Sequence, residues 1–248
     1  MLLHTKGQTH NFQEPLVGRV TRDPNRVENS FLILEDGFQP ISNSACIGLI
    51  TNQKLVQRVG ELPIMYGVPS LDHLAEGDIV SIDEDGNLNT IYRVNSFHNT
   101  LLATERCNSN CLMCSQPPKD RNDIQYSYAI HCKLIPLIPK DCPELGISGG
   151  EPTLMGDYFY DLIKLAKREL PNTEIHILTN GRSFAWPQVA EKLQVCFVAL
   201  DSGLRRAGKE VSRGQGHRDC LGDARQVIAQ AGKRHRSIEW ERTGLGRN

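Results

Sequence analysis

The sequence lacks three features that would indicate a membrane, an export route or a highly charged partner. No apolar run reaches the roughly 18 residues that a membrane-spanning helix needs, so we expect no membrane association. The opening residues, MLLHTKGQTH, lack a basic segment followed by an apolar one, so we expect no secretory signal and a cytoplasmic location. Lys and Arg number 28 and Asp and Glu number 29 among the 248 residues, and this balance gives no reason to expect a nucleic-acid partner.

Cysteine, by contrast, is present in an informative arrangement. Of eight cysteines, three fall within eight residues, at Cys107, Cys111 and Cys114, and the other five are scattered. In a reducing compartment a tight group of cysteines is typical of metal ligands or redox chemistry rather than of disulfides. We interpret the five scattered cysteines as buried or incidental thiols.

Three regions of the chain differ in their patterning. Residues 1–98 predict a small β-rich N-terminal domain, with a short apolar strand at 31–34 and a hairpin that turns at 84–87. Residues 99–200 alternate strands with helices, which predicts a parallel sheet with right-handed crossovers. Residues 201–248 form an atypical basic tail with 11 Lys and Arg, 6 Asp and Glu and eight glycines, and from this composition we expect no packed core.

The predicted fold class is α/β. Strands are expected at 100–104, 144–148, 174–178 and 195–200, and helices at 123–137, 154–170 and 187–193. Ligands of parallel sheets gather beyond the carboxyl ends of the strands. Every motif considered below follows one of these predicted strands, so we expect the motifs to share one site.

The cysteine group has the spacing C-x3-C-x2-C. Thiolates are soft ligands and suit either zinc or an iron–sulfur cluster. A structural zinc site needs four closed ligands, and here His131 and Cys132, the next candidates, lie inside a predicted helix. Three thiolates on a cubane leave one iron without a protein ligand, and such an open position suits catalysis. A zinc-binding module remains the alternative interpretation of these residues.

The cysteine spacing directly after a strand resembles the radical S-adenosylmethionine (SAM) superfamily. Gly149–Pro152, after the second strand, is similar to the GGEP element of that family, and Thr179–Gly181 follows the third strand as in many members. Ala199–Ser202 is a loose match to the S-L-D-G element after the fourth strand. Taken singly, these short motifs also fit ordinary turns and helix starts. The resemblance implies a partial (β/α) barrel of the radical SAM type for residues 99–200.

The resemblance also implies cofactors and residue roles. Cys107, Cys111 and Cys114 would hold a [4Fe–4S] cluster, and SAM would chelate the fourth iron. Reductive cleavage of SAM would then generate a 5′-deoxyadenosyl radical. The implied SAM contacts include the Glu151 carboxylate, which would receive the ligand's ammonium. The full set of implied SAM-binding residues is Met113, Gly149, Gly150, Glu151, Pro152, Asn180 and Asp201, with Met113 near the adenine and the two glycines allowing close approach.

A closer resemblance is to the His-Xaa-Ser system radical SAM maturase, in its C-type branch. It is carried by the run from Leu101 to Lys119, which ends in Cys114-Ser-Gln-Pro-Pro-Lys119. The segments 147–153 and 176–182 also fit. The implied partners are a small His-Xaa-Ser repeat protein as substrate and a reductase of the flavodoxin or ferredoxin type. Composition changes abruptly near residues 195–205, and from this we expect a truncated or frameshifted chain. The alternative function is therefore a truncated, non-catalytic Fe–S protein or partner subunit.

Overall fold

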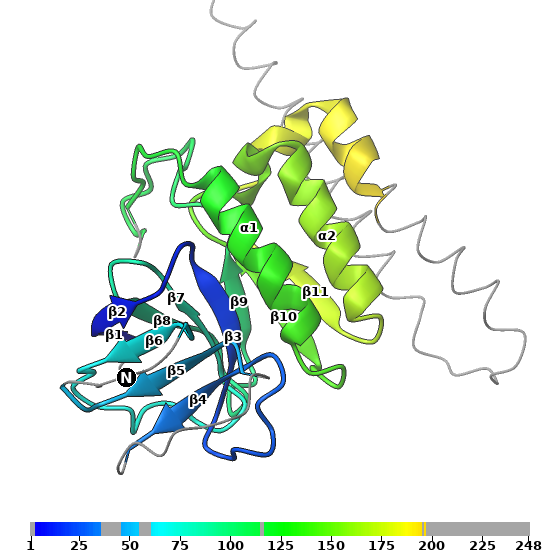
Figure 1. Ribbon diagram of the computed structural model, residues 1–248. Helices are drawn as coiled ribbons and strands as arrows, with labels where there is room; N and C mark the ends of the chain where they lie inside the picture. The colour runs from blue at the N-terminus through cyan, green and yellow to red at the C-terminus, as the bar shows by residue number, and fades with distance from the viewer. Residues whose placement is uncertain (1–2, 36–45, 55–60, 115–116, 195, 197–248) are drawn as a thin grey trace, which may run out of the picture.

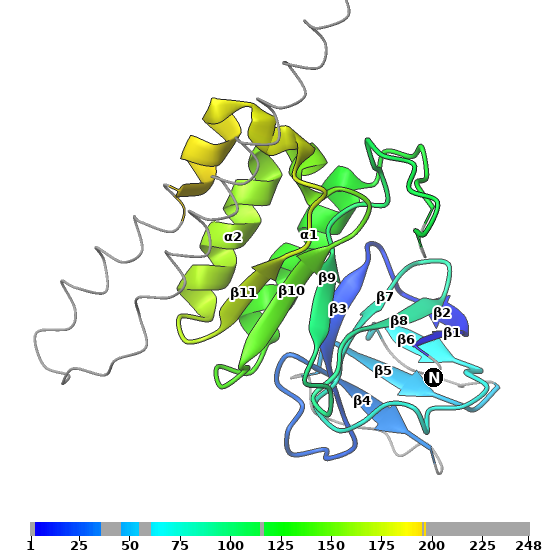
Figure 2. The ribbon, with the colours of Figure 1, turned by 180° about the vertical axis from the view of Figure 1, so that it is seen from behind.

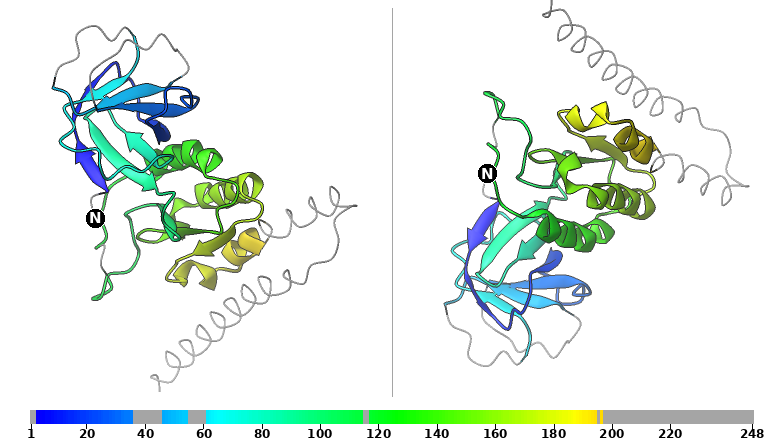
Figure 3. Two further views of the ribbon diagram at one scale, coloured as in Figure 1. Left: turned by 90° about the horizontal axis from the view of Figure 1, so that it is seen from below. Right: turned by 90° about the horizontal axis from the view of Figure 1, so that it is seen from above.

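The structure is a computed structural model that describes residues 3–35, 46–54, 61–114, 117–194 and 196 (Figure 1). The described residues form an eight-stranded sheet, here called the large sheet, and a three-stranded sheet, called the small sheet. Helices α1 and α2 accompany the small sheet, and α1 lies between the large sheet and α2 (Figures 1 and 3). Within the described part of the chain, no helix is both long enough and apolar enough to span a bilayer.

The large sheet is mixed and its two ends are connected by the start of the chain. Its strand order is β1-β8-β7-β3-β4-β5-β6-β2, with parallel pairing from β3 to β6 and antiparallel pairing elsewhere. The two edge strands, β1 and β2, are separated in the sequence by Gly7. One short segment, residues 4–10, therefore forms both edges of the sheet, and the sheet is curled. The strands are β1 His4–Lys6, β2 Gln8–His10, β3 Leu16–Thr21, β4 Ser30–Leu34, β5 Gly48–Thr51, β6 Ile64–Tyr66, β7 Ile79–Ile82 and β8 Asn87–Tyr92.

Apolar side chains fill the interior of this curled sheet. Strands β4, β5 and β7 are buried along most of their length, as expected for strands that face a core on one side and packed neighbours on the other. The predicted strand at 31–34 is confirmed as β4, and the predicted hairpin is confirmed as β7 and β8. Its turn is fixed by Asp83, which accepts hydrogen bonds from the Asn87 backbone and side-chain nitrogens, both at 2.8 Å.

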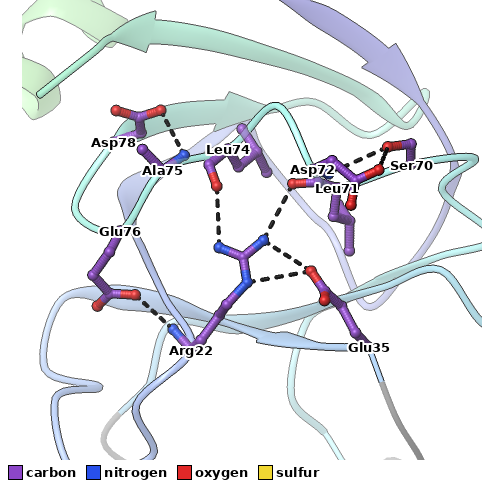
Figure 4. Close-up of polar contacts among 9 residues, drawn as sticks. All are labelled: Arg22, Glu35, Ser70, Leu71, Asp72, Leu74, Ala75, Glu76 and Asp78. Carbon is purple, nitrogen blue, oxygen red and sulfur yellow. Dashed lines mark hydrogen bonds and ion pairs between the residues drawn. The ribbon is translucent and has the colours of Figure 1, made fainter. Parts of the chain in front are cut away.

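One arginine ties the loop before β7 to the rim of the large sheet (Figure 4). The Arg22 guanidinium donates to the carbonyl oxygens of Leu74 at 3.0 Å and Leu71 at 3.2 Å. It also pairs with the Glu35 carboxylate at 2.8 Å, while the Arg22 backbone N–H donates to Glu76 at 2.9 Å. The Leu71 carbonyl also accepts the Leu74 N–H at 3.0 Å, so Arg22 adds a second donor there and supplies a donor to the Leu74 carbonyl.

The small sheet and its helices follow the predicted order closely. Strands β9 Asn99–Leu102, β10 Glu144–Ser148 and β11 Glu174–Ile177 are parallel, in the order β11-β10-β9. Figure 2 shows the face of this sheet that no described helix covers. The helical segments are α1 Ile124–Leu134, the 3-10 turns η1 Ile135–Leu137, η2 Pro152–Met155 and η3 Arg182–Ala185, and α2 Asp157–Glu169. The α/β class is therefore confirmed, although three strands do not make a barrel.

Two predicted helices are interrupted for identifiable reasons. The helix predicted at 123–137 is α1 followed by a 3-10 turn, because Pro136 lacks the N–H that a further α-helical turn requires. The helix predicted at 154–170 begins as η2 and restarts at Asp157, because Gly156 has a φ of 61°. Helix α2 then buries one face, formed by Phe159, Tyr160, Leu162, Ile163 and Ala166.

The fourth predicted strand, 195–200, is not supported where it can be checked. Residues 187–194 are helical, in agreement with the predicted helix at 187–193, and Cys196 is helical too. Cys196 is buried, and its thiol lies 3.9 Å from the Tyr160 carbonyl oxygen in α2. Residues 195 and 197–248, including the rest of that strand and the basic tail, lie outside the described residues.

The large sheet packs directly on the helix that follows the cysteines. Val17, Ile79 and Tyr92 share one hydrophobic core with Leu134 and with the small sheet. Two polar contacts reinforce this packing: the Arg19 guanidinium donates to the Leu137 carbonyl at 2.5 and 3.0 Å, and Lys133 Nζ donates to the Pro15 carbonyl at 3.0 Å. The predicted division into domains at residue 98 stays a prediction, but the two sheets share a core.

Candidate functional site

The carboxyl ends of the three parallel strands bring the predicted motifs to one edge. Ser148 is in register with Leu102, and Ile147 is in register with Ile177, so the segments after β9, β10 and β11 begin side by side. The ladder continues past the strands, since the Ala103 N–H donates to the Ser148 carbonyl at 2.7 Å. The cysteine segment, the Gly-Gly-Glu-Pro segment and the Thr-Asn-Gly segment therefore meet at this edge.

The start of the cysteine loop, here residues 105–121, is fixed by a buried carboxylate. Thr104 is fully buried, and its hydroxyl donates to Asp123 at 2.6 Å. The other Asp123 oxygen accepts the Glu105 backbone N–H at 2.7 Å, and the Arg106 N–H donates back to the Thr104 hydroxyl at 3.1 Å. Asp123 precedes α1 yet makes no side-chain cap for it, because its carboxylate serves the strand end instead. Sequence analysis missed Asp123, whose position suggests only a helix cap.

Charged side chains close the far end of the same loop. The Lys119 backbone N–H donates to the Glu105 carbonyl at 3.0 Å, and Lys119 Nζ lies 2.7 Å from the Glu105 carboxylate. Arg121 forms an ion pair with the other oxygen of Glu105. The loop is thus anchored at both ends while its middle carries the three cysteines.

The two glycines after β10 allow the cysteine segment to approach closely. The Gly150 N–H donates to the Thr104 carbonyl at 2.7 Å. A Cβ on Gly149, whose φ is 141°, would lie 2.4 Å from that carbonyl oxygen. A Cβ on Gly150 would lie 2.1 Å from the Arg106 carbonyl oxygen and 3.0 Å from the Cys107 Cβ. The close approach observed is therefore to the chain's own cysteine segment, whereas an approach of these glycines to SAM stays a prediction.

Glu151 is buried and receives several hydrogen bonds at the centre of the three segments. Its side chain is 0% exposed. One oxygen accepts from the hydroxyls of Thr153 at 2.6 Å and Thr179 at 2.7 Å, and from the Thr153 N–H at 3.1 Å. The other accepts the Asn180 backbone N–H at 2.8 Å. No ion pair joins this carboxylate to a Lys or Arg among the described residues, so its charge is available to a bound ammonium group.

The segment after β11 connects the carboxylate to the cysteines. The Asn180 side-chain amide donates to the Asn108 side-chain oxygen at 2.8 Å and to the Ser109 hydroxyl at 3.2 Å, and it lies 4.0 Å from the Cys107 sulfur. The Arg182 guanidinium donates to the Asn108 carbonyl oxygen at 2.7 Å. Asn180 was predicted as a site residue. Asn108 and Arg182 were missed, because Asn108 occupies an unspecified position of the cysteine motif and Arg182 comes directly after the Thr-Asn-Gly segment.

The three cysteines differ in exposure. Cys107 is half-buried beside Asn180, whereas Cys111 and Cys114 are exposed. In the part of the chain that the structure describes, no three His, Cys, Asp or Glu side chains are gathered closely enough to hold a metal ion. The predicted ligand set therefore stays a prediction.

The remaining residues predicted to contact SAM are Met113, Pro152 and Asp201. The side chain of Met113 is 97% exposed, so its predicted contact with adenine is not tested by any packing seen here. Pro152 is buried at the first position of η2, where its fixed φ favours a helical start. Asp201 lies outside the described residues.

The zinc interpretation gains no fourth ligand from α1. His131 is buried in that helix, and its ring nitrogen donates to the Ser127 carbonyl oxygen. Burial lowers the pKa of His131, with the Ser127 hydrogen bond acting in the opposite direction. His131 therefore has a structural role within α1. Three soft thiols in one loop fit an iron–sulfur cluster with one open iron better than a closed zinc site.

Comparison with known families agrees with this chemistry. The family model described as the Radical SAM superfamily matches residues 101–202. No curated protein matches the chain, and no solved structure matches it. Residues 101–202 therefore match a radical SAM domain, and membership of that family would imply a [4Fe–4S] cluster and SAM as cofactors. The matched range contains the cysteine loop and both segments that hold it.

Proposed function

We propose that this chain is a radical SAM enzyme that modifies a small His-Xaa-Ser repeat protein after translation. The match of residues 101–202 to the Radical SAM superfamily model supports the general activity. The observation that supports it is the convergence of the cysteine loop, Glu151 and the segment after β11 at one sheet edge. The peptide substrate rests on the resemblance of residues 101–119 to the C-type maturase branch.

Different residues of the chain bind the cluster and SAM. The cysteine loop supplies three thiolates to a [4Fe–4S] cluster, and the cluster with SAM supplies reductive cleavage of the SAM C5′–S bond. Glu151 would receive the ammonium group of SAM on the oxygen that accepts the Asn180 N–H. Thr153 and Thr179 hold the other oxygen and fix the plane of the carboxylate. A reductase of the flavodoxin or ferredoxin type delivers the electron.

The uncovered face of the small sheet is a suitable place for a substrate peptide. Thr100 and Leu102 of β9 and His176 of β11 are exposed on that side, while the opposite face is packed against the helices. This face lies directly below the edge that carries the cysteine loop. A peptide laid on this face would present its side chains to the edge that carries the cysteine loop.

The experiment is a modification assay under anaerobic conditions. The purified chain is reconstituted with iron and sulfide, reduced, and incubated with SAM and a synthetic peptide of repeated His-Xaa-Ser units. We expect a change in peptide mass, located by fragmentation to the repeat. The Cys111→Ala variant should leave the peptide unchanged, and Cys132→Ala, a matched loss of a thiol in α1, should behave as the unaltered chain.

Two results would contradict parts of the proposal. Cleavage of SAM with no change in the peptide would reject the His-Xaa-Ser substrate and leave the radical SAM activity standing. A chain that binds a cluster and cleaves no SAM would instead favour the alternative, a non-catalytic Fe–S protein or partner subunit.

A further inference from the structure

Two side chains after β11 hold the first part of the cysteine loop. Arg182 donates to the Asn108 carbonyl oxygen at 2.7 Å and to the Ser109 hydroxyl at 3.4 Å. Asn180 donates to the Asn108 side chain at 2.8 Å and to the same Ser109 hydroxyl at 3.2 Å. Both therefore bind the residues that directly follow Cys107.

The two side chains are themselves held in place. The Arg182 backbone N–H donates to the Asn180 side-chain oxygen at 3.0 Å, so the Asn180 amide is oriented with its nitrogen toward the loop. The Asn180 backbone N–H donates to buried Glu151 at 2.8 Å. Since Glu151 is fixed in turn by Thr153 and Thr179, the first part of the cysteine loop is joined to the most buried point of the site.

The tip of the cysteine loop is exposed to solvent. Cys111, Leu112, Met113 and Cys114 are all exposed, and the side chains of Leu112 and Met113 are almost completely so. Of the three cysteines, Cys107 is half-buried and Cys111 and Cys114 are exposed.

We propose that Arg182 is a positioning residue for the cluster: with Asn180 it sets Cys107 in place before the cluster is loaded, and its charge then stabilises the reduced cluster. This inference rests on the proposed function, because it requires a cluster on these cysteines. A prearranged first ligand lowers the conformational entropy that cluster binding costs. A guanidinium bound to the residues that follow the first ligand favours the more negative, reduced state, because hydrogen bonds and net charge near a cluster set its reduction potential.

The first part of the test uses the full-length chain without cluster, so it is independent of SAM chemistry. The protein is treated with iodoacetamide for increasing times, and alkylation of each cysteine is followed by peptide mass spectrometry. We expect Cys107 to react several-fold more slowly than Cys111 in the unaltered chain. Arg182→Ala should raise the rate at Cys107 several-fold and leave the rate at Cys111 unchanged. Arg168→Ala, which removes an exposed arginine from α2, should change neither rate.

The second part uses the reconstituted, cluster-loaded chain. Iron content and the midpoint potential of the cluster are measured by redox titration followed by electron paramagnetic resonance. Arg182→Gln keeps a donor for the Asn108 carbonyl and removes the charge, so we expect iron near the unaltered level and a more negative potential. The ratio of reduced to oxidised cluster at a fixed applied potential should fall about tenfold, or about 59 mV for one electron. Arg182→Lys should restore the potential.

The outcomes separate this inference from the proposed function. Equal alkylation rates at Cys107 in the unaltered chain and Arg182→Ala, or an unchanged potential in Arg182→Gln, would overturn the role of Arg182. Loss of the cluster in Arg182→Ala alone, with the cluster kept in Arg182→Gln, supports the hydrogen bond to Asn108 as the holding contact. An unaltered chain that takes up no cluster would instead refute the proposed function, and the role of Arg182 with it.

Discussion

Thr104 and Asp123 are joined by a 2.6 Å hydrogen bond between two buried side chains, and this bond ties the end of β9 to the start of α1. The residues are 19 positions apart, and the whole cysteine loop lies between them. The bond therefore closes the loop at its base, next to the Lys119 and Arg121 contacts of Glu105.

Replacing Thr104 by valine should loosen the cysteine loop. The substitution keeps the side-chain shape and leaves one Asp123 oxygen without its donor, which costs about 1–3 kcal/mol of unfolding free energy. We expect this loss in urea denaturation, together with lower iron content after reconstitution. Thr173→Val is the matched control, because the Thr173 hydroxyl makes a buried hydrogen bond to the Cys142 carbonyl away from the loop. A Thr104→Val chain with full iron content would contradict a role for this bond in the site.

A methyl group at Gly150 should disrupt the site more than the fold. The added Cβ would lie 2.1 Å from the Arg106 carbonyl oxygen, so the cysteine segment must move away from the segment after β10. We expect Gly150→Ala to bind a several-fold smaller amount of iron, measured by colorimetric assay. Gly67→Ala is the control: its φ of 67° makes alanine strained, yet its Cβ would meet nothing within 4 Å. That variant should lose about 1 kcal/mol of stability and keep its iron. Equal iron in both variants would argue against the close approach.

The charge of Glu151 should matter for SAM and little for the cluster. Glu151→Gln removes the negative charge that would receive the ligand's ammonium, and charge-assisted hydrogen bonds contribute about 1.5–3 kcal/mol. We expect SAM affinity to fall about tenfold or more by calorimetry on the loaded chain. Glu174→Gln, an exposed change at the other end of β11, should leave affinity unaltered. Unchanged affinity in Glu151→Gln would assign this carboxylate a purely structural role.

Arg22 should stabilise the large sheet without affecting the site. Arg22→Ala removes the arginine donor from the Leu74 carbonyl and one of two donors from the Leu71 carbonyl, which costs roughly 1–2 kcal/mol. The partly exposed pair with Glu35 adds little because water screens it. We expect a lower melting temperature with unchanged iron content. Arg26→Ala, whose ion-pair partner is Asp23 on the surface, should melt close to the unaltered chain. A normal melting temperature in Arg22→Ala would show that the segment is held by its apolar contacts alone.

Local patterns predicted much of the second half of the chain. The strand expected at 144–148 is β10 without any shift, because its buried residues are bounded by a proline and by two glycines. The order of motifs and their meeting at one edge follow from parallel pairing, which the alternation of strands and helices indicates. These regularities are local in sequence and so can be read before the fold is known.

Other features depend on contacts that are distant in sequence. The curled large sheet needs β1 and β2 to pair with β8 and β6, and three-residue strands carry too little pattern to predict such pairing. The run at 195–200 is apolar enough for either a strand or a buried helix, and Cys196 is helical. The side chains that hold the cysteine loop, Asp123 and Arg182, act only because folding brings them there.

The most direct test of the radical SAM activity is 5′-deoxyadenosine formation. The chain is reconstituted anaerobically, reduced with dithionite and given SAM without peptide, and the nucleoside is measured by liquid chromatography with mass spectrometry beside the Cys111→Ala variant. The account predicts 5′-deoxyadenosine from the unaltered chain and none from the variant. A fully loaded, reduced chain that leaves SAM intact, or equal product from the two chains, would contradict it.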